Sequence, residues 1–239
     1  LLGSDPVAMA ENAARAASLG ALAIDINFGC PAKTVNKHRG GAALLKEPIL
    51  IHKIVSAVRS AVPSEVPISA KIRLGTDDAS ELAENVAAIS EAGSSWLTIH
   101  ARTKAQGYRP PVNWHAIADA RRYASGMTII ANGDVHSKAT AELCQQITGC
   151  NTLMIGRAAV SQPGLVDEIV NGCEPLGWAD IKQAQLKFLA EMSGNELGIV
   201  GRYKQWLAMT ALHYPEAAAD FALIKRLKHR KAVFDLMAL

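Results

Sequence analysis

Short runs of apolar residues alternate with longer stretches in which apolar residues recur every three or four positions. The short runs predict strands, and the longer stretches predict helices, the first of which we expect Ser4 to cap. Their regular alternation is typical of βα units in a parallel sheet, so the sequence predicts an α/β protein. The predicted helices span 6–19, 48–62, 79–92, 114–123 and 137–147, and the predicted strands span 21–27, 68–73, 96–100, 127–131 and 152–155.

The number of strands indicates a barrel whose beginning is missing. The pattern predicts five strands, or six if residues 1–3 are the tail of another, whereas a closed (β/α)8 barrel of the TIM type needs about eight. The chain also lacks an initiator Met, so we expect a piece of a longer protein. A barrel without its N-terminal strands would have open sheet edges, which would hinder independent folding and ligand binding.

The pattern changes to helices alone near residue 171. We therefore predict two domains, an incomplete barrel over 1–171 and an all-helical domain over 172–239. The helical domain carries a run of basic residues at 225–231. Its predicted helices span 180–192, 199–213 and 216–226, with a last segment that runs to residue 239.

Composition excludes several classes of protein. The chain has 25 Lys and Arg against 22 Asp and Glu, a formal charge of +3, so bulk electrostatics do not identify a partner. No apolar run approaches the ~20 residues of a membrane span, and we expect no membrane association. The 4 cysteines form no Cys-x-x-Cys pair, so neither a metal site nor a disulfide framework is indicated. We expect a cytoplasmic monomer.

Polar and glycine-rich residues follow each predicted strand, at the end where α/β sheets place their sites. Loops after the last strands of barrels often bind phosphate, because glycines let backbone N–H groups approach an anion. Asn132, Asp134, Gly156 and Arg157 lie in those two loops. An ordinary tight turn and the start of a helix would explain the same residues.

Three further residues lie where chemistry is expected. Cys30 follows a strand in a Gly-Cys-Pro turn, and a thiol there can act as nucleophile or proton donor, although most cysteines only pack. Lys71 and His100 lie near strand ends and would point into the barrel mouth, with Arg73 on the face of Lys71. A buried lysine is costly without an anionic or electron-rich partner. A water-facing strand and a hydrogen-bonded core histidine are the alternatives.

Basic residues also gather after Cys30 and after His100. Together with the run at 225–231 they could form a nucleic-acid footprint that the small net charge conceals. A solvated helix face explains the C-terminal run equally well. The basic residues that follow Cys30 and His100 are Lys33, Lys37, His38, Arg39, Arg102, Lys104 and Arg109.

Six motifs resemble, in order, those of the tRNA dihydrouridine synthases, flavoproteins that reduce uridine in tRNA. The resemblance covers about 1–163, and Lys-Gln-Trp-Leu at 204–207 is similar to the bacterial C subfamily, which acts on uridine 16. The motifs are Asn-Phe-Gly-Cys-Pro-Ala-Lys at 27–33, Arg-Gly-Gly-Ala-Ala-Leu-Leu at 39–45, Lys-Ile-Arg-Leu-Gly at 71–75, Ile-His-Ala-Arg-Thr at 99–103, Ala-Asn-Gly-Asp at 131–134 and Met-Ile-Gly-Arg at 154–157.

The resemblance implies FMN as cofactor, NADPH as electron donor and tRNA as substrate. It implies that Cys30 protonates C5 of uracil and that Asn27 positions the base. It further implies that Arg102 contacts RNA or the flavin edge and that the helical domain holds the tRNA. The residues that it places around the flavin and its phosphate are Lys71, His100, Asn132, Asp134, Gly156 and Arg157.

Two other functions are considered. A barrel flavoprotein that reduces a small pyrimidine or an enone would need no helical domain. A catalytically silent RNA-binding protein would purify without the yellow colour of flavin.

Overall fold

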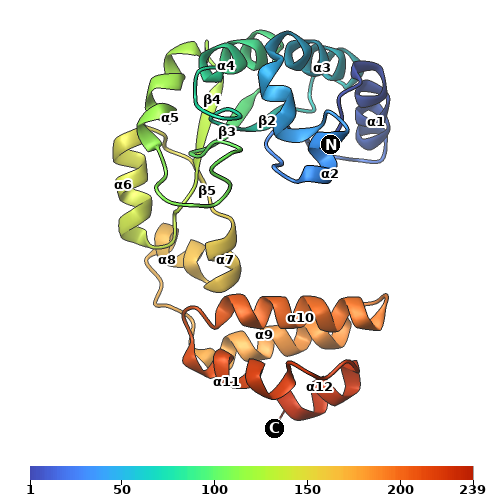
Figure 1. Ribbon diagram of the computed structural model, residues 1–239, viewed down its shortest axis with the longest axis vertical. Helices are drawn as coiled ribbons and strands as arrows, with labels where there is room; N and C mark the ends of the chain where they lie inside the picture. Colours follow the sequence, from blue (N-terminus) through green and yellow to red (C-terminus); the bar gives the residue numbers. More distant parts are fainter. Residues whose placement is uncertain (239) are drawn as a thin grey trace. The chain divides into compact units, whose positions relative to one another are not determined.

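The computed structural model describes residues 1–238, which form two compact units. The first unit comprises residues 1–135 and 139–154, and the second comprises 136–138 and the chain from 155 onward. Each unit has its own apolar core. Most elements of both units are labelled in Figure 1.

The first unit contains a five-stranded sheet in which all strands are parallel. Neighbours in the sheet are neighbours in the chain, without the reversal of strand order that open, doubly wound sheets show. This is the order of a (β/α)8 barrel, as predicted. The strands are β1 (Ile24–Asn27), β2 (Ile68–Arg73), β3 (Trp96–His100), β4 (Thr128–Asn132) and β5 (Leu153–Met154).

The backbone of Leu1 pairs with β1. Its amino group donates to the carbonyl of Asp25 at 2.6 Å, and the N–H of Asn27 donates to the Leu1 carbonyl at 2.9 Å. Two such bonds from alternate residues are the pattern of a parallel ladder. Leu1 therefore lies in the sheet beside β1, as expected for the tail of a strand.

The helices that precede or link the strands cover one face of the sheet (Figure 1). Adjacent helices pack against each other in chain order, α1 on α3, α3 on α4 and α4 on α5. A single layer of helices outside the strands is the arrangement of a barrel wall. These helices are α1 (Pro6–Ser18), α3 (Pro48–Ala61), α4 (Leu82–Glu91), α5 (Trp114–Ala120), which continues into η2 (Arg121–Tyr123), and α6 (Lys138–Thr148).

The structure corrects three local predictions. Asp5, not Ser4, caps α1, because its carboxylate accepts hydrogen bonds from Val7 and Ala8 N–H and Pro6 occupies the first turn. β1 begins at Ile24 instead of residue 21, where pairing with β2 begins. The prediction gave no element to the segment after Cys30, which forms α2 (Lys33–Lys37) and the 3-10 helix η1 (Gly41–Lys46).

The two faces of the sheet differ in polarity. Ile26, Ala70, Leu97 and Ile129 are paired across four strands and share a face, since paired residues point the same way. All four are buried, because this face packs against the helices. The alternate positions form the other face and carry the polar side chains of Asn27, Lys71, Thr98, Arg73, His100 and Asn132.

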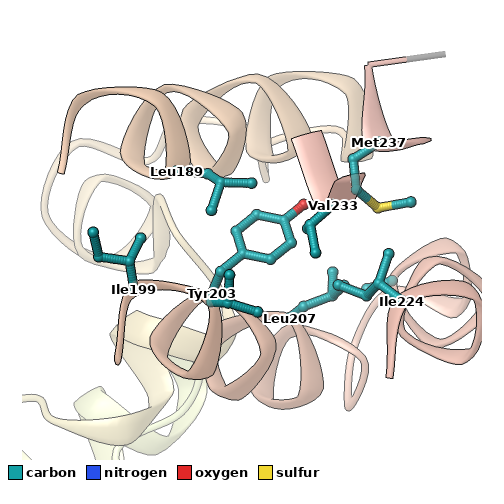
Figure 2. Close-up of a cluster of buried hydrophobic side chains, with 9 residues drawn as sticks. Leu189, Ile199, Tyr203, Leu207, Ile224, Val233 and Met237 are labelled. Carbon is teal, nitrogen blue, oxygen red and sulfur yellow. The ribbon is translucent and has the colours of Figure 1, made fainter. Parts of the chain in front are cut away.

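The second unit is helical. Tyr203 lies at the centre of its core, where Figure 2 shows its ring among Leu189, Leu207 and Val233. Burial, with a smaller contribution from Asp220, raises the pKa of Tyr203 to about 12. The helices are α7 (Arg157–Ser161), α8 (Leu165–Asn171), α9 (Trp178–Glu191), α10 (Glu196–Thr210), α11 (Pro215–Ile224) and α12 (Arg230–Met237).

Contacts divide the chain earlier than the domain boundary predicted between 171 and 172. The reason is that α7 packs on α10, where the Trp206 indole N–H donates to the Val160 carbonyl at 3.0 Å. A functional boundary after residue 171 remains a prediction.

Residues 1–238 contain neither a helix suited to cross a membrane nor a cluster of metal-binding side chains. No helix within residues 1–238 combines the length and the hydropathy that a membrane crossing requires. Within the same residues, His, Cys, Asp and Glu side chains form no group of three or more suited to a metal ion.

Candidate functional site

The register of the sheet brings the predicted site residues of four strands onto one face. Asn27 is paired with Lys71, and one row further along Arg73, His100 and Asn132 are paired in succession. These rows lie at the carboxyl ends of the strands, where a barrel places its site. The site therefore begins as a polar end on one face of the sheet.

The side chain of Asn27 holds the turn that carries Cys30. Its Oδ1 accepts hydrogen bonds from the N–H of Gly29 at 2.9 Å and of Cys30 at 3.0 Å. Its Nδ2 has no hydrogen-bond partner among the described residues and remains available as a donor. Asn27 can thus orient the thiol and still contact a ligand.

The carbonyl of Cys30 is held as firmly as its amide. It accepts from the side-chain Nδ2 of Asn36 at 2.8 Å and from the N–H of Ala42 at 3.0 Å. Gly41 has a φ of 62°, and a Cβ built on it would lie 2.7 Å from the Cys30 carbonyl oxygen. Only glycine fits both requirements. The thiol is half-buried and unbonded to other cysteines.

Lys71 is a half-buried cation whose hydrogen-bond partner is neutral. Its Nζ donates to Oδ1 of Asn132 at 2.9 Å, across β3. Desolvation, helped by repulsion from Arg73, lowers the pKa of Lys71 to about 8 against a weak opposing effect of Asp25. Beside it, Thr98 Oγ1 is buried without a hydrogen bond among the described residues. This face therefore favours a ligand with negative charge and polar atoms.

Asn132 was predicted to lie near a phosphate, but its side chain is already engaged at both ends. Besides accepting from Lys71, it donates through Nδ2 to the Met154 carbonyl at 2.7 Å, which ties β4 to β5. In this arrangement Asn132 orients Lys71. Any contact with an anion falls to other groups of the loop that follows it.

Arg102 and Asp134 form a bidentate ion pair. Arg102 Nη1 and Nη2 lie 2.9 and 2.5 Å from the two carboxylate oxygens, and Nε donates to the Arg109 carbonyl at 2.7 Å. The Arg102 side chain is 2% exposed. The guanidinium is engaged by this pair, and the contact of Arg102 with RNA or the flavin edge remains a prediction. The pair fixes the loop after β3.

His100 ends β3 next to an aromatic ring and a glycine. Its ring centroid lies 6.1 Å from that of Tyr108, which is 55% exposed. A Cβ on Gly133, whose φ is 125°, would lie 3.1 Å from His100 Cδ2. The absence of a side chain at Gly133 therefore lets the loop after β4 approach the imidazole.

Gly156 and Arg157 belong to the second unit. Gly156 precedes α7 and Arg157 is its first residue. A Cβ on Gly156 would meet no atom within 4 Å, so the structure does not require glycine there for packing. Their predicted contact with a phosphate remains a prediction.

The site contains two residues that the prediction of roles did not include, Asn36 and Arg73. Asn36 holds the Cys30 carbonyl. Arg73 donates through Nε to the Gly29 carbonyl at 2.9 Å. The only signal for Arg73 in the sequence was its position two residues after Lys71, which places both on one face. Nothing in the local sequence pointed to Asn36.

The chain is similar in sequence to one family along almost its whole length. A sequence model described as "Dihydrouridine synthase (Dus)" matches residues 1–228. A relative from Shewanella oneidensis, named tRNA-dihydrouridine(16) synthase, is 46% identical over 99% of this chain and 76% of its own length. A protein of the same name from Aquipseudomonas alcaligenes is 44% identical over 100% of this chain and 78% of its own.

Solved structures share the fold at low sequence identity. Morphinone reductase superposes with a TM-score of 0.51 at 14% identity, over 71% of this chain and 49% of the other. A dihydrodipicolinate synthase family protein from Coccidioides immitis gives 0.52 at 15% identity, over 96% of this chain and 78% of the other. These similarities support the barrel fold alone.

Proposed function

Since the chain belongs to the dihydrouridine synthase family, we propose that it reduces a uridine of tRNA, at position 16, to 5,6-dihydrouridine. FMN is the cofactor in this proposal and NADPH the electron donor. The observation that carries it is the placement of Cys30, a half-buried thiol held by Asn27 in the turn after β1, where Asn27 is itself paired with the half-buried Lys71. The relatives named for position 16 support the choice of uridine.

The polar end of the sheet fits a flavin chemically. A reduced flavin carries negative charge on its pyrimidine ring, and Lys71 is a cation without a charged hydrogen-bond partner. Thr98 Oγ1 and Asn27 Nδ2 have unused hydrogen-bonding capacity on the same face. Lys71 and His100 would hold the ring, and the loop at 133–134 would contact the phosphate. When bound, FMN supplies the hydride that C6 of uracil receives.

The protein's own residues supply binding and one proton. Asn27 donates from Nδ2 to the base while its Oδ1 keeps the Cys30 turn in place. Cys30 gives the proton of its thiol to C5, so that the C5–C6 double bond becomes single, and the thiolate regains a proton from water. Lys71 compensates negative charge on its side of the site. The base must leave its stack to reach these groups.

The second unit holds the body of the tRNA in this proposal. Exposed cations in the 225–231 segment bind phosphates, which makes binding dependent on salt. The protein acts as a cytoplasmic monomer.

Replacing Cys30 by alanine tests the reaction. We expect Cys30→Ala to retain FMN and NADPH oxidation but to lose dihydrouridine formation by about 10²–10⁴-fold, the usual contribution of a general acid. The substrate is tRNA from cells that lack the gene, and mass spectrometry of this tRNA after the reaction measures the amount of dihydrouridine and its position. Cys173→Ala, which changes an exposed cysteine, is the control and should behave as the parent protein. Equal product yields from both variants would remove Cys30 from the acid role.

A further inference from the structure

Arg73 is a buried cation that joins two loops of the site. It is 3% exposed, and it donates hydrogen bonds to three backbone carbonyls. Nε donates to Gly29, in the Cys30 turn, at 2.9 Å, and Nη1 donates to Thr103 at 3.0 Å and to Gly107 at 2.8 Å, in the loop after β3. Burying a guanidinium is costly. The burial of Arg73 on the polar face of the sheet therefore indicates a role beyond packing.

The peptide group between Gly29 and Cys30 is held from both sides. Its N–H donates to Asn27 Oδ1, and its carbonyl accepts from Arg73 Nε. The next peptide group is also held, because the Cys30 carbonyl accepts from Asn36 and Ala42. A peptide group is a rigid plane. Fixing the planes on both sides of the Cys30 Cα fixes the direction in which the side chain leaves the backbone.

We propose that Arg73 is a positioning residue for the Cys30 thiol, a role that rests on the proposed function of Cys30 as proton donor. Arg73 holds the Gly29–Cys30 peptide in the orientation that points the thiol at the base. Because Arg73 also binds the loop after β3, the position of the thiol depends on the conformation of that loop. Small errors of placement cost much rate in a proton transfer.

Two further contacts agree with this role. The Arg73 guanidinium carbon lies 5.4 Å from the centroid of the Tyr108 ring, a cation–π contact that joins the same loop to the arginine. Burial lowers the pKa of Arg73, whereas the charges of Tyr108 and Cys30 raise it. The guanidinium thus lies within electrostatic reach of the sulfur.

Arg73→Lys is the test, because lysine keeps the charge but cannot hold separate carbonyls in a fixed fork. The matched control is Arg59→Lys, since Arg59 also donates to three carbonyls, those of Val62, Pro63 and Val66, and none of them lies in the Cys30 turn. The measurements on the holoenzyme are FMN content, kcat and KM for tRNA, and the rate at which iodoacetamide alkylates Cys30, followed by mass spectrometry over a range of pH.

We expect Arg73→Lys to lower kcat about tenfold and to change the Cys30 alkylation rate about threefold or more. KM and FMN content should stay within about twofold of the parent, since Arg73 does not bind tRNA or flavin in this proposal. Arg59→Lys should change none of these quantities. A parental alkylation profile and kcat in a folded Arg73→Lys protein would overturn the proposal.

A second variant keeps the test decisive if Arg73→Lys does not fold. Tyr108→Leu removes the cation–π partner of Arg73 from an exposed position, and we expect it to change the alkylation rate in the same direction, by about twofold. No change would overturn the positioning role. If the parent protein makes no dihydrouridine, the proposed function fails, but the alkylation rates still decide whether Arg73 positions the thiol.

Discussion

At the scale of single residues, Lys71 shows how burial and function are linked. Its pKa of about 8 lies below the ordinary lysine value because desolvation disfavours the charged form. Between that value and the ordinary one, the unfolded chain holds a proton that the folded chain has lost. This group therefore makes unfolding less favourable as pH rises through that window. An anionic ligand reverses the preference, because it stabilises the ammonium.

FMN affinity should therefore depend on the charge of Lys71. We expect affinity to fall as pH rises above about 8, whereas Lys71→Met should bind about tenfold more weakly at neutral pH and show no fall across the same range. Lys71→Arg, which stays charged, should keep its affinity at high pH. Quenching of FMN fluorescence on both sides of pH 8 measures this. A parental pH dependence in Lys71→Met would contradict the assignment.

At the scale of elements, α1 depends on one residue before its first turn. The Asp5 carboxylate accepts two backbone hydrogen bonds at 2.9 Å. Asp5→Ala should lower the free energy of unfolding by about 1 kcal/mol, because two N–H groups lose their partner. Ser4→Ala, one position earlier, should change it by less than about 0.5 kcal/mol. Urea unfolding measures both, and equal losses would return the cap to Ser4.

At the scale of the whole molecule, the distribution of charge matters more than its sum. Several basic residues of the predicted footprint stabilise the fold. Arg39 binds Glu47, and Arg102 binds Asp134. The Arg230 guanidinium binds the carbonyls of Ala190 and Met192 at the end of α9. Within residues 1–238, the exposed side chains without an ion-pair partner in the 225–231 segment are those of Lys225, Arg226 and Lys228. These three cations are left for phosphates.

Binding of tRNA should reflect this difference. We expect Arg226→Glu to weaken binding several-fold and to reduce the slope of log K against log salt by about 1. Lys187→Glu changes an exposed cation of α9 outside the segment and serves as the matched control. Fluorescence anisotropy with labelled tRNA at several salt concentrations measures the slopes. Equal slopes for both variants would place the phosphate contacts elsewhere.

Local patterns in the sequence predicted the strands, most of the helices and the face on which the polar residues lie. β2 and β3 have the predicted bounds, because alternation within a strand depends on neighbours in the chain. The same alternation placed Lys71 and Arg73 on one side, and motif order identified the family. These features are local, so a linear pattern contains them.

Only the tertiary structure decided what the site residues contact. Arg102 meets a carboxylate 32 positions away, and Arg73 meets the Gly29 carbonyl 44 positions away. The pairing of strands that are distant in sequence brings those partners together. Buried polar groups must form hydrogen bonds, so the available partners determine whether an arginine can bind substrate or instead holds a loop. The contacts of Asn36 and Asn132 could not be predicted for the same reason, since the carbonyls they hold come from backbone folded against them.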